Sequence, residues 1–173
     1  MRQVKPRFTI ADAVTALRIP LAVTFPLTEN HGLQLAIVAA AAASDFVDGR
    51  LARRLGPSRV GAVLDPIADK LFMLAAFLTV AHHGLLSWWE IVLVLSRDIM
   101  AGLGTLGTLF LGRPLALPAR AGGKAVTVCQ LLTLVAYIAE SSLVRPLAWA
   151  TAAISVYAIW DYGRAAARAV HHP

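Results

Sequence analysis

Long apolar blocks are the feature of this 173-residue chain that most constrains its fold. Crossing the hydrocarbon core of a bilayer takes roughly 20 residues of helix, and only helices or closed barrels can satisfy their backbone there. The chain is 58% hydrophobic and 15% charged, whereas a soluble domain carries about a quarter charged residues. We therefore predict an all-α polytopic membrane protein, a single domain over residues 1–173, with six transmembrane helices at approximately Val14–Leu27, Leu33–Val47, Val60–Ala81, Leu86–Leu111, Ala125–Ala139 and Val144–Ile159.

The Lys and Arg residues predict the orientation of these helices. They gather in alternate connections, and the intervening connections at 28–32 and 82–87 have none. By the positive-inside rule, both termini face the cytoplasm, and the protein is placed in the inner (cytoplasmic) membrane. The net charge of +6 is explained by topology and anionic lipid headgroups, so we expect no nucleic-acid partner. The basic residues that define the cytoplasmic side include Arg2, Lys5, Arg7, Arg18, Arg50, Arg53, Arg54, Arg59, Arg113, Arg120, Lys124, Arg164 and Arg168.

Two pairs of aspartates stand out against the apolar background. Asp45 and Asp48 are three residues apart, and Asp65 and Asp69 are four apart, so each pair shares one face of a helix. A Gly-Pro sequence between the two helices predicts a turn. The two pairs are thus expected to face each other at the cytoplasmic end of two antiparallel helices.

Four neighbouring carboxylates cannot all stay ionised without cations. Their hard oxygens favour Mg²⁺ or Mn²⁺, and two such ions about 4 Å apart are suited to phosphoryl transfer. Arg53 is placed to approach a phosphate, and Gly49, Ala52 and Gly61 leave space for a ligand beside the helices. A solvated helix end with simple ion pairs is the alternative, but it does not need two same-face carboxylate pairs framed by glycines.

These residues resemble the signature of the CDP-alcohol phosphotransferase (CDP-alcohol phosphatidyltransferase) family. Thr15–Pro20 also resembles the opening of the family's first helix, and 65–70 is similar to its glycerophospholipid branch. Eight fixed positions match in order: Asp45, Asp48, Gly49, Ala52, Arg53, Gly61, Asp65 and Asp69.

The resemblance implies an enzyme that moves the phosphatidyl group of CDP-diacylglycerol to an alcohol and releases CMP. It further implies a cytoplasmic active site with two Mg²⁺ or Mn²⁺ ions held by Asp45, Asp48, Asp65 and Asp69, and a homodimeric membrane protein. Asp69 would also be the general base. The cytidine diphosphate moiety would lie against Gly49, Ala52, Arg53 and Gly61.

The acceptor alcohol depends on other parts of the chain. Arg97-Asp98 is a charge pair within an apolar block, where charge is expensive and often functional. Arg97, Arg120 and Lys124 together are predicted to bind a phosphate on the acceptor. Glycerol 3-phosphate is our expected acceptor. Phosphatidylglycerol is the alternative, because Arg97-Asp98 and Tyr162-Gly163-Arg164 look more like the cardiolipin-forming members.

Two other classes of protein are considered. A divalent-cation transporter would need acidic residues spread through the middle of the membrane, and here the acids cluster at one end with arginines beside them. A purely structural membrane protein would be insensitive to substitution of Asp69. The enzyme is the favoured interpretation.

Overall fold

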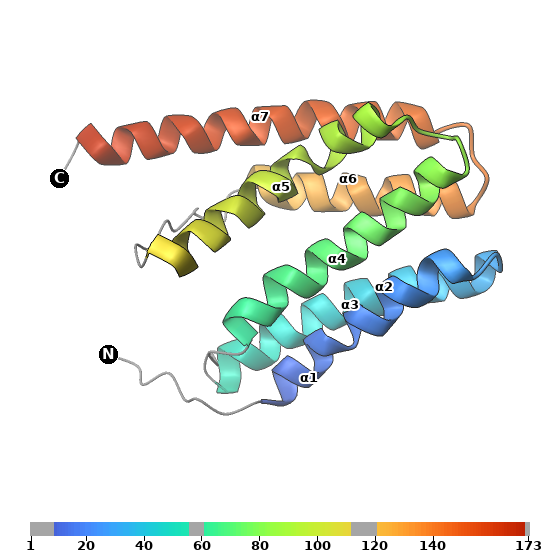
Figure 1. Ribbon diagram of the computed structural model, residues 1–173, viewed down its shortest axis with the longest axis horizontal. Helices are drawn as coiled ribbons and strands as arrows, with labels where there is room; N and C mark the ends of the chain where they lie inside the picture. The colour runs from blue at the N-terminus through green and yellow to red at the C-terminus, as the bar shows by residue number, and fades with distance from the viewer. Residues whose placement is uncertain (1–8, 56–60, 112–120, 172–173) are drawn as a thin grey trace. The chain divides into compact units, whose positions relative to one another are not determined.

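In the computed structural model, which describes residues 9–55, 61–111 and 121–171, every regular element is an α-helix (Figure 1). This confirms the all-α class. The chain divides into two compact units, Met1–Thr79 and Val80–Pro173, with the boundary near the end of α4. The helices are α1 (Ile10–Ala16), α2 (Arg18–Leu27), α3 (His31–Leu55), α4 (Gly61–His82), α5 (Trp88–Leu111), α6 (Ala121–Ile138) and α7 (Val144–His171).

The first unit is built on a helical hairpin. Helix α1 begins with a capping box, in which the Thr9 backbone N–H donates to Asp12 at 2.7 Å and the Asp12 N–H donates back to the Thr9 hydroxyl at 3.4 Å. Leu17 keeps a right-handed helical conformation, so α2 continues from α1 with little interruption. Helix α3 folds back along both of them (Figure 1). Phe25 of α2 meets Phe72 of α4 edge to face, with ring centroids 6.2 Å apart.

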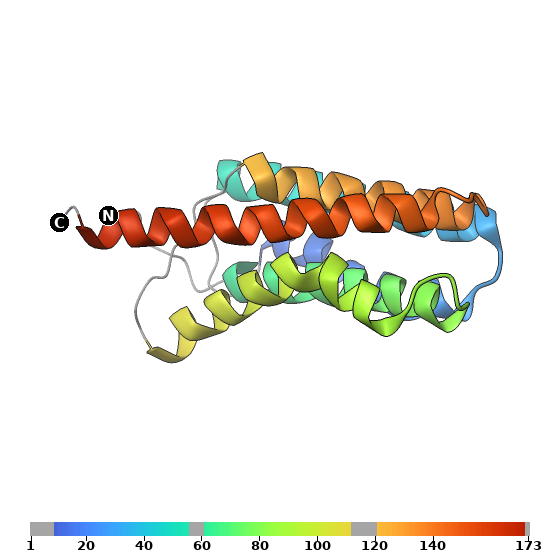
Figure 2. The same cartoon turned by 90° about the horizontal axis from the view of Figure 1, so that it is seen from above.

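In the second unit, α7 packs against both α5 and α6 (Figure 2). Polar side chains join these helices in a buried interior. The backbone carbonyl of Val94 on α5 accepts hydrogen bonds from Gln130 of α6 at 3.2 Å and from Ser155 of α7 at 3.3 Å. Thr133 and Thr151 lie 3.4 Å apart between α6 and α7. Such interhelical hydrogen bonds are typical of helices that associate in lipid.

Many large apolar side chains of the described helices are exposed, and several polar side chains are buried beside an apolar core. Two segments among the described residues, Ile10–Leu27 and His31–Leu51, are long and apolar enough to cross a membrane by length and composition. The predicted set of six spans goes beyond this finding and stays a prediction. The exposed apolar residues include Val23, Leu27, Trp88, Leu103 and Tyr157; the buried polar ones include Thr15, Gln130, Thr133, Thr151 and Ser155.

Candidate active site

Three of the four signature aspartates converge on the α1–α2 segment in the first unit. The hydroxyl oxygen of Thr15 lies 2.8 Å from Asp48 Oδ2 and 2.6 Å from Asp65 Oδ1. Thr15 is fully buried, Asp48 is buried, and Asp65 is half-buried. One side chain of α1 therefore connects a carboxylate of α3 with a carboxylate of α4, as the paired spacing in the sequence predicts for these two helices.

Arg18 is the positive charge of this cluster. Its Nη2 atom forms an ion pair with Asp48 and lies 3.2 Å from Asp45 Oδ1. Its Nε donates to the Ser44 hydroxyl at 2.9 Å, and Ser44 in turn donates to the carbonyl of Ala41. The guanidinium is 2% exposed, whereas the Asp45 side chain is 65% exposed. Arg18 thus neutralises part of the first carboxylate pair from inside the protein.

The donors of the cluster suit a hard divalent cation, because they are carboxylate and hydroxyl oxygens. Among the described residues, however, no three carboxylate, imidazole or thiol groups surround a common ion position. Arg18 Nη2 contacts both Asp45 and Asp48, so a guanidinium nitrogen takes up one oxygen of each carboxylate. The donor chemistry therefore fits the predicted ions, and their positions stay a prediction.

The other signature positions lie on the same two helices. Asp69 follows Asp65 by one turn of α4 and is half-buried, and Gly61 is buried at the first position of that helix. Gly49 is half-buried on α3. Ala52 and Arg53 belong to α3, but their side chains lie outside the described part of the structure. The predicted approach of Arg53 to a phosphate is therefore untested.

A second charged cluster lies within the second unit, around Arg97 of α5. Arg97 Nη1 donates to Asp98 Oδ1 at 2.8 Å, and Gln130 of α6 donates to Asp98 Oδ2 at 2.6 Å. The Tyr162 side chain of α7 also forms a hydrogen bond with Arg97. This pairing fixes the guanidinium against α6 and α7.

Gly123 makes this close approach possible. A Cβ atom at this position would lie 2.5 Å from Arg97 Nη2 and 2.8 Å from the Tyr162 hydroxyl, which is closer than real Cβ contacts. The next residue, Lys124, has an exposed side chain. Arg120, the third predicted phosphate ligand, lies outside the described residues.

The Arg97 side chain retains unused hydrogen-bonding capacity. Its Nε is buried and has no hydrogen-bond partner among the described residues. A buried, charged N–H without a partner is costly, and such groups are often found where a ligand binds. This observation supports the predicted role of Arg97 in binding an anion.

Four residues of these clusters are not assigned a role from the sequence: Thr15, Arg18, Gln130 and Tyr162. The sequence groups Arg18 only with the basic residues of the cytoplasmic side, and that orientation stays a prediction. The structure adds that Arg18 is buried against Asp45 and Asp48. An arginine within an otherwise apolar helix is a usable signal, since such a charge requires a partner.

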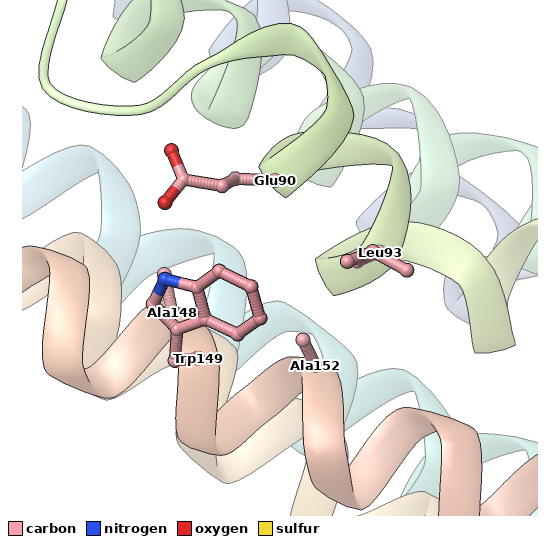
Figure 3. Close-up of a pocket in the computed structure, with 5 residues that line it drawn as sticks. All are labelled: Glu90, Leu93, Ala148, Trp149 and Ala152. Carbon is pink, nitrogen blue, oxygen red and sulfur yellow. The ribbon is translucent and has the colours of Figure 1, made fainter.

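A hollow elsewhere in the second unit is lined by Glu90, Leu93, Ala148, Trp149 and Ala152 (Figure 3). Glu90 extends from α5 toward the indole nitrogen of Trp149, with which it forms a hydrogen bond. Its carboxylate also accepts from the Ser87 N–H at 2.8 Å and pairs with Arg145 at 3.3 Å. Glu90 therefore caps α5 and ties it to α7, which is a structural role.

Comparison with known proteins identifies the relatives of this chain. It is 34% identical over 124 residues to a "Putative cardiolipin synthase" of Mycobacterium tuberculosis, covering 69% of this chain and 59% of that protein. It is 33% identical over 135 residues to a "Probable phosphatidylglycerophosphate synthase" of the same organism, covering 72% and 63%. It is also 35% identical over 116 residues to the "CDP-diacylglycerol--glycerol-3-phosphate 3-phosphatidyltransferase" of Escherichia coli, covering 57% and 63%.

The chain thus spans about three fifths of the length of these relatives. The model of the CDP-alcohol phosphatidyltransferase family matches residues 8–160. This range covers most of the chain and includes all four signature aspartates, Arg97, Asp98 and Gln130. The chain belongs to the CDP-alcohol phosphatidyltransferase family.

Proposed function

We propose that this protein is an integral-membrane phosphatidyltransferase that moves the phosphatidyl group of CDP-diacylglycerol to a glycerol-type acceptor bearing a phosphate. The observation that carries this proposal is the convergence of Asp45, Asp48 and Asp65 on Arg18 and Thr15. Concentrated negative charge on oxygen ligands at the end of a membrane helix is expensive unless it binds cations. The divalent ions that accompany a diphosphate substrate would be those cations.

In the proposed reaction, the acceptor hydroxyl loses its proton to Asp69 and its oxygen attacks the phosphorus that bears diacylglycerol. The bond from that phosphorus to the oxygen of CMP breaks, and CMP leaves with the electron pair. Asp69 is suited to the role of base because it follows Asp65 on the same helix and is only half-buried. The chain contributes positioning and electrostatic stabilisation, which account for most catalysis of phosphoryl transfer.

Asp45, Asp48, Asp65 and Asp69 would hold the divalent ions, either Mg²⁺ or Mn²⁺. When bound, such ions neutralise charge on the diphosphate and on the leaving CMP. We assign the cytidine diphosphate moiety to Gly49, Ala52, Arg53 and Gly61 on the same two helices. The small residues of this group leave room for the ligand beside the backbone.

We assign the phosphate of the acceptor to Arg97, with Lys124 and Arg120. The buried, unpartnered Nε of Arg97 supports this role, because a guanidinium can bind a phosphate through two parallel N–H groups. Glycerol 3-phosphate is the acceptor that we favour. Two of the relatives described above bear names for the corresponding reaction.

Phosphatidylglycerol is the second candidate acceptor. It is supported by a relative named as a putative cardiolipin synthase and by the Arg97-Asp98 pair, which the sequence associates with cardiolipin-forming members. Both acceptors present a phosphate beside a glycerol hydroxyl, so the same arginine serves either one. The two differ in whether the acceptor enters from water or from the bilayer.

The apolar exterior and the apolar segments Ile10–Leu27 and His31–Leu51 support an integral membrane location. We propose six spans in the inner membrane, with both termini cytoplasmic and the aspartates at the cytoplasmic side. A homodimer is part of the proposal. Crosslinking in membranes and labelling of single introduced cysteines would measure oligomeric state and sidedness.

The reaction is tested with the purified full chain in mixed micelles, using CDP-diacylglycerol labelled in the cytidine and Mg²⁺ or Mn²⁺. We expect CMP release with glycerol 3-phosphate, little release with phosphatidylglycerol, and a chelator to abolish it. Preference for phosphatidylglycerol would reverse the choice of acceptor. Absence of release with both acceptors would contradict the proposed activity.

The role of Asp69 is tested in the same assay with Asp69→Asn. We expect CMP release to fall by about a hundredfold or more, as is typical for loss of a general base. Glu29→Gln is the matched control, because it also converts an acid to an amide and Glu29 is exposed outside the signature. Equal activity of the two variants would remove Asp69 from the mechanism.

A further inference from the structure

We infer that Arg18 is a positioning residue that competes with bound divalent cations for Asp45 and Asp48, and thereby sets the metal concentration at which the site fills. The inference rests on the proposed function, since it takes these aspartates as metal ligands. It assigns Arg18 an electrostatic role beyond holding α2 against α3. The role follows from three features of the cluster.

The first feature is that Arg18 shares its contact atoms with the proposed ions. Its Nη2 contacts Asp48 Oδ2 and Asp45 Oδ1, which are carboxylate oxygens of two residues that would hold the ions. The Arg18 side chain is 2% exposed, so its positive charge lies inside the protein beside these oxygens.

The second feature is that the position of the guanidinium is fixed independently of the carboxylates. Arg18 Nε donates to the Ser44 hydroxyl at 2.9 Å, and Ser44 is anchored by its bond to the carbonyl of Ala41 on the preceding turn of α3. A fixed guanidinium keeps its positive charge beside the aspartates whether or not a metal is bound. The charge therefore opposes metal binding at every stage of filling.

The third feature is an excess of acceptors around Thr15. Its hydroxyl has one hydrogen, but Asp48 Oδ2, Asp65 Oδ1 and the carbonyl of Ala11 all lie within 3.2 Å of it. One hydrogen cannot satisfy all of these oxygens. In the described contacts, Asp48 and Asp65 are thus held together by a single hydroxyl hydrogen, and Arg18 offsets part of the negative charge.

Two opposing effects decide the outcome when the charge of Arg18 is removed. Loss of its hydrogen bonds loosens Asp45 and Asp48, and this weakens metal binding. Loss of a positive charge a few ångströms from the ions strengthens it, and at such distances the Coulomb effect is the larger of the two. We therefore expect neutral variants to bind metal more tightly and to be less stable without it.

The experiment measures thermal unfolding of the purified full chain in detergent, first in chelator and then across a Mn²⁺ titration. Binding to the folded state raises the unfolding temperature once the metal concentration exceeds the dissociation constant. For Arg18→Met and Arg18→Gln, we expect a lower unfolding temperature in chelator and an onset of stabilisation at about tenfold lower Mn²⁺. For Arg18→Lys, which keeps the charge, we expect an onset close to that of the wild type.

Arg145→Met is the matched control, because Arg145 also pairs with a buried carboxylate, Glu90, but lies in the other unit. It should leave the Mn²⁺ onset unchanged. A variant that unfolds in chelator and is recovered by Mn²⁺ also supports the inference. If both neutral variants stay unfolded even in saturating Mn²⁺, the metal cannot replace the guanidinium and the inference is overturned.

An unchanged or higher Mn²⁺ onset in the neutral variants would likewise overturn the competition, as would a wild type that Mn²⁺ does not stabilise. These outcomes are separate from failure of the proposed function. That failure would be seen as absence of CMP release by the wild type with either acceptor. A protein that releases CMP but shows no charge-dependent onset contradicts only the role of Arg18.

Discussion

The two charged clusters of this protein use a buried arginine in different ways. Arg18 faces Asp45 and Asp48 from a different helix, while Asp65 adds further negative charge through Thr15. Among the described residues, Arg97 forms an ion pair with its neighbour Asp98, and Tyr162 is a neutral partner. In the described contacts, the first cluster therefore has more acid than base, and the second pairs one acid with one base of the same helix.

This difference indicates which ligands the clusters suit. A site with surplus carboxylates attracts cations, and its arginine moderates that attraction. A balanced pair with an unused, buried guanidinium N–H suits an anion, which can add to the arginine without displacing Asp98. The comparison thus supports the proposal of metal-assisted chemistry at one cluster and phosphate recognition at the other.

Asp48→Asn gives the largest expected effect. It removes a proposed metal ligand from the acid-rich cluster, and we expect CMP release to fall by about a hundredfold to a thousandfold. The loss of stability should be modest, because Asp45 still pairs with Arg18. CMP release and the unfolding temperature are measured on the same preparation. Full activity would show that the acidic surplus is not used in the reaction.

Asp98→Asn is expected to lower stability more than Asp48→Asn does. It leaves the Arg97 guanidinium without its only described carboxylate partner, and loss of one partner of a buried pair costs about 3 kcal/mol. Unfolding in mixed micelles measures this cost. Arg145→Gln is the comparison, because Arg145 is 61% exposed and its pair should be worth less than about 1 kcal/mol. Equal costs for the two variants would contradict the idea of a balanced, buried pair.

Gly123→Ala tests the anion site without changing its charge. The new methyl group would displace Arg97 or Tyr162, and we expect the KM for the phosphate-bearing acceptor to rise by about tenfold. The KM for CDP-diacylglycerol should not change. Gly122→Ala is the control, because its nearest neighbour would be Ala158 at an ordinary 3.4 Å. Similar kinetics for both variants would exclude Arg97 from acceptor binding.

Ser44→Ala gives the smallest expected effect and refines the description of the first cluster. Arg18 loses one neutral hydrogen bond but keeps both carboxylates, so the free energy of unfolding should fall by about 1 kcal/mol. CMP release should stay within a few-fold of the wild type. A loss of activity as large as that of Asp48→Asn would mean that the orientation of Arg18, and not only its charge, is required.

Hydropathy alone locates most of the helices, but the helices continue beyond some of the apolar blocks. The predicted block Leu33–Val47 is extended by α3 to Leu55, and Val144–Ile159 is extended by α7 to His171. The first extension holds three Arg and two Leu, and the second holds four Ala and two Arg; all three residue types favour helix. Apolar runs mark where a helix contacts an apolar environment, and backbone hydrogen bonding continues beyond them. The separation of α1 from α2 is likewise not visible in the apolar pattern.

Spacing within one helix predicts the aspartate pairs, because residues three or four apart must share a face. Partners from distant segments are harder to predict. Thr15 lies 33 residues before Asp48, and Gln130 lies 32 residues after Asp98, so no local periodicity links them. These contacts depend on which helices pack together. Only an isolated charge such as Arg18 signals in advance that a partner must exist.

The burial of Arg18 also has a consequence for how the chain is made. In the proposed membrane location, an arginine within a spanning segment raises the free energy of its entry into the bilayer from the translocon. The increase is about 2.5 to 3.5 kcal/mol at the helix centre and less toward the cytoplasmic end, where the aspartates are proposed to lie. Its carboxylate partners arrive only with α3, since Asp45 and Asp48 follow α2 in the chain. We therefore expect the newly synthesised α1–α2 segment to wait at the translocon until α3 emerges, and the hairpin to enter the lipid as one unit.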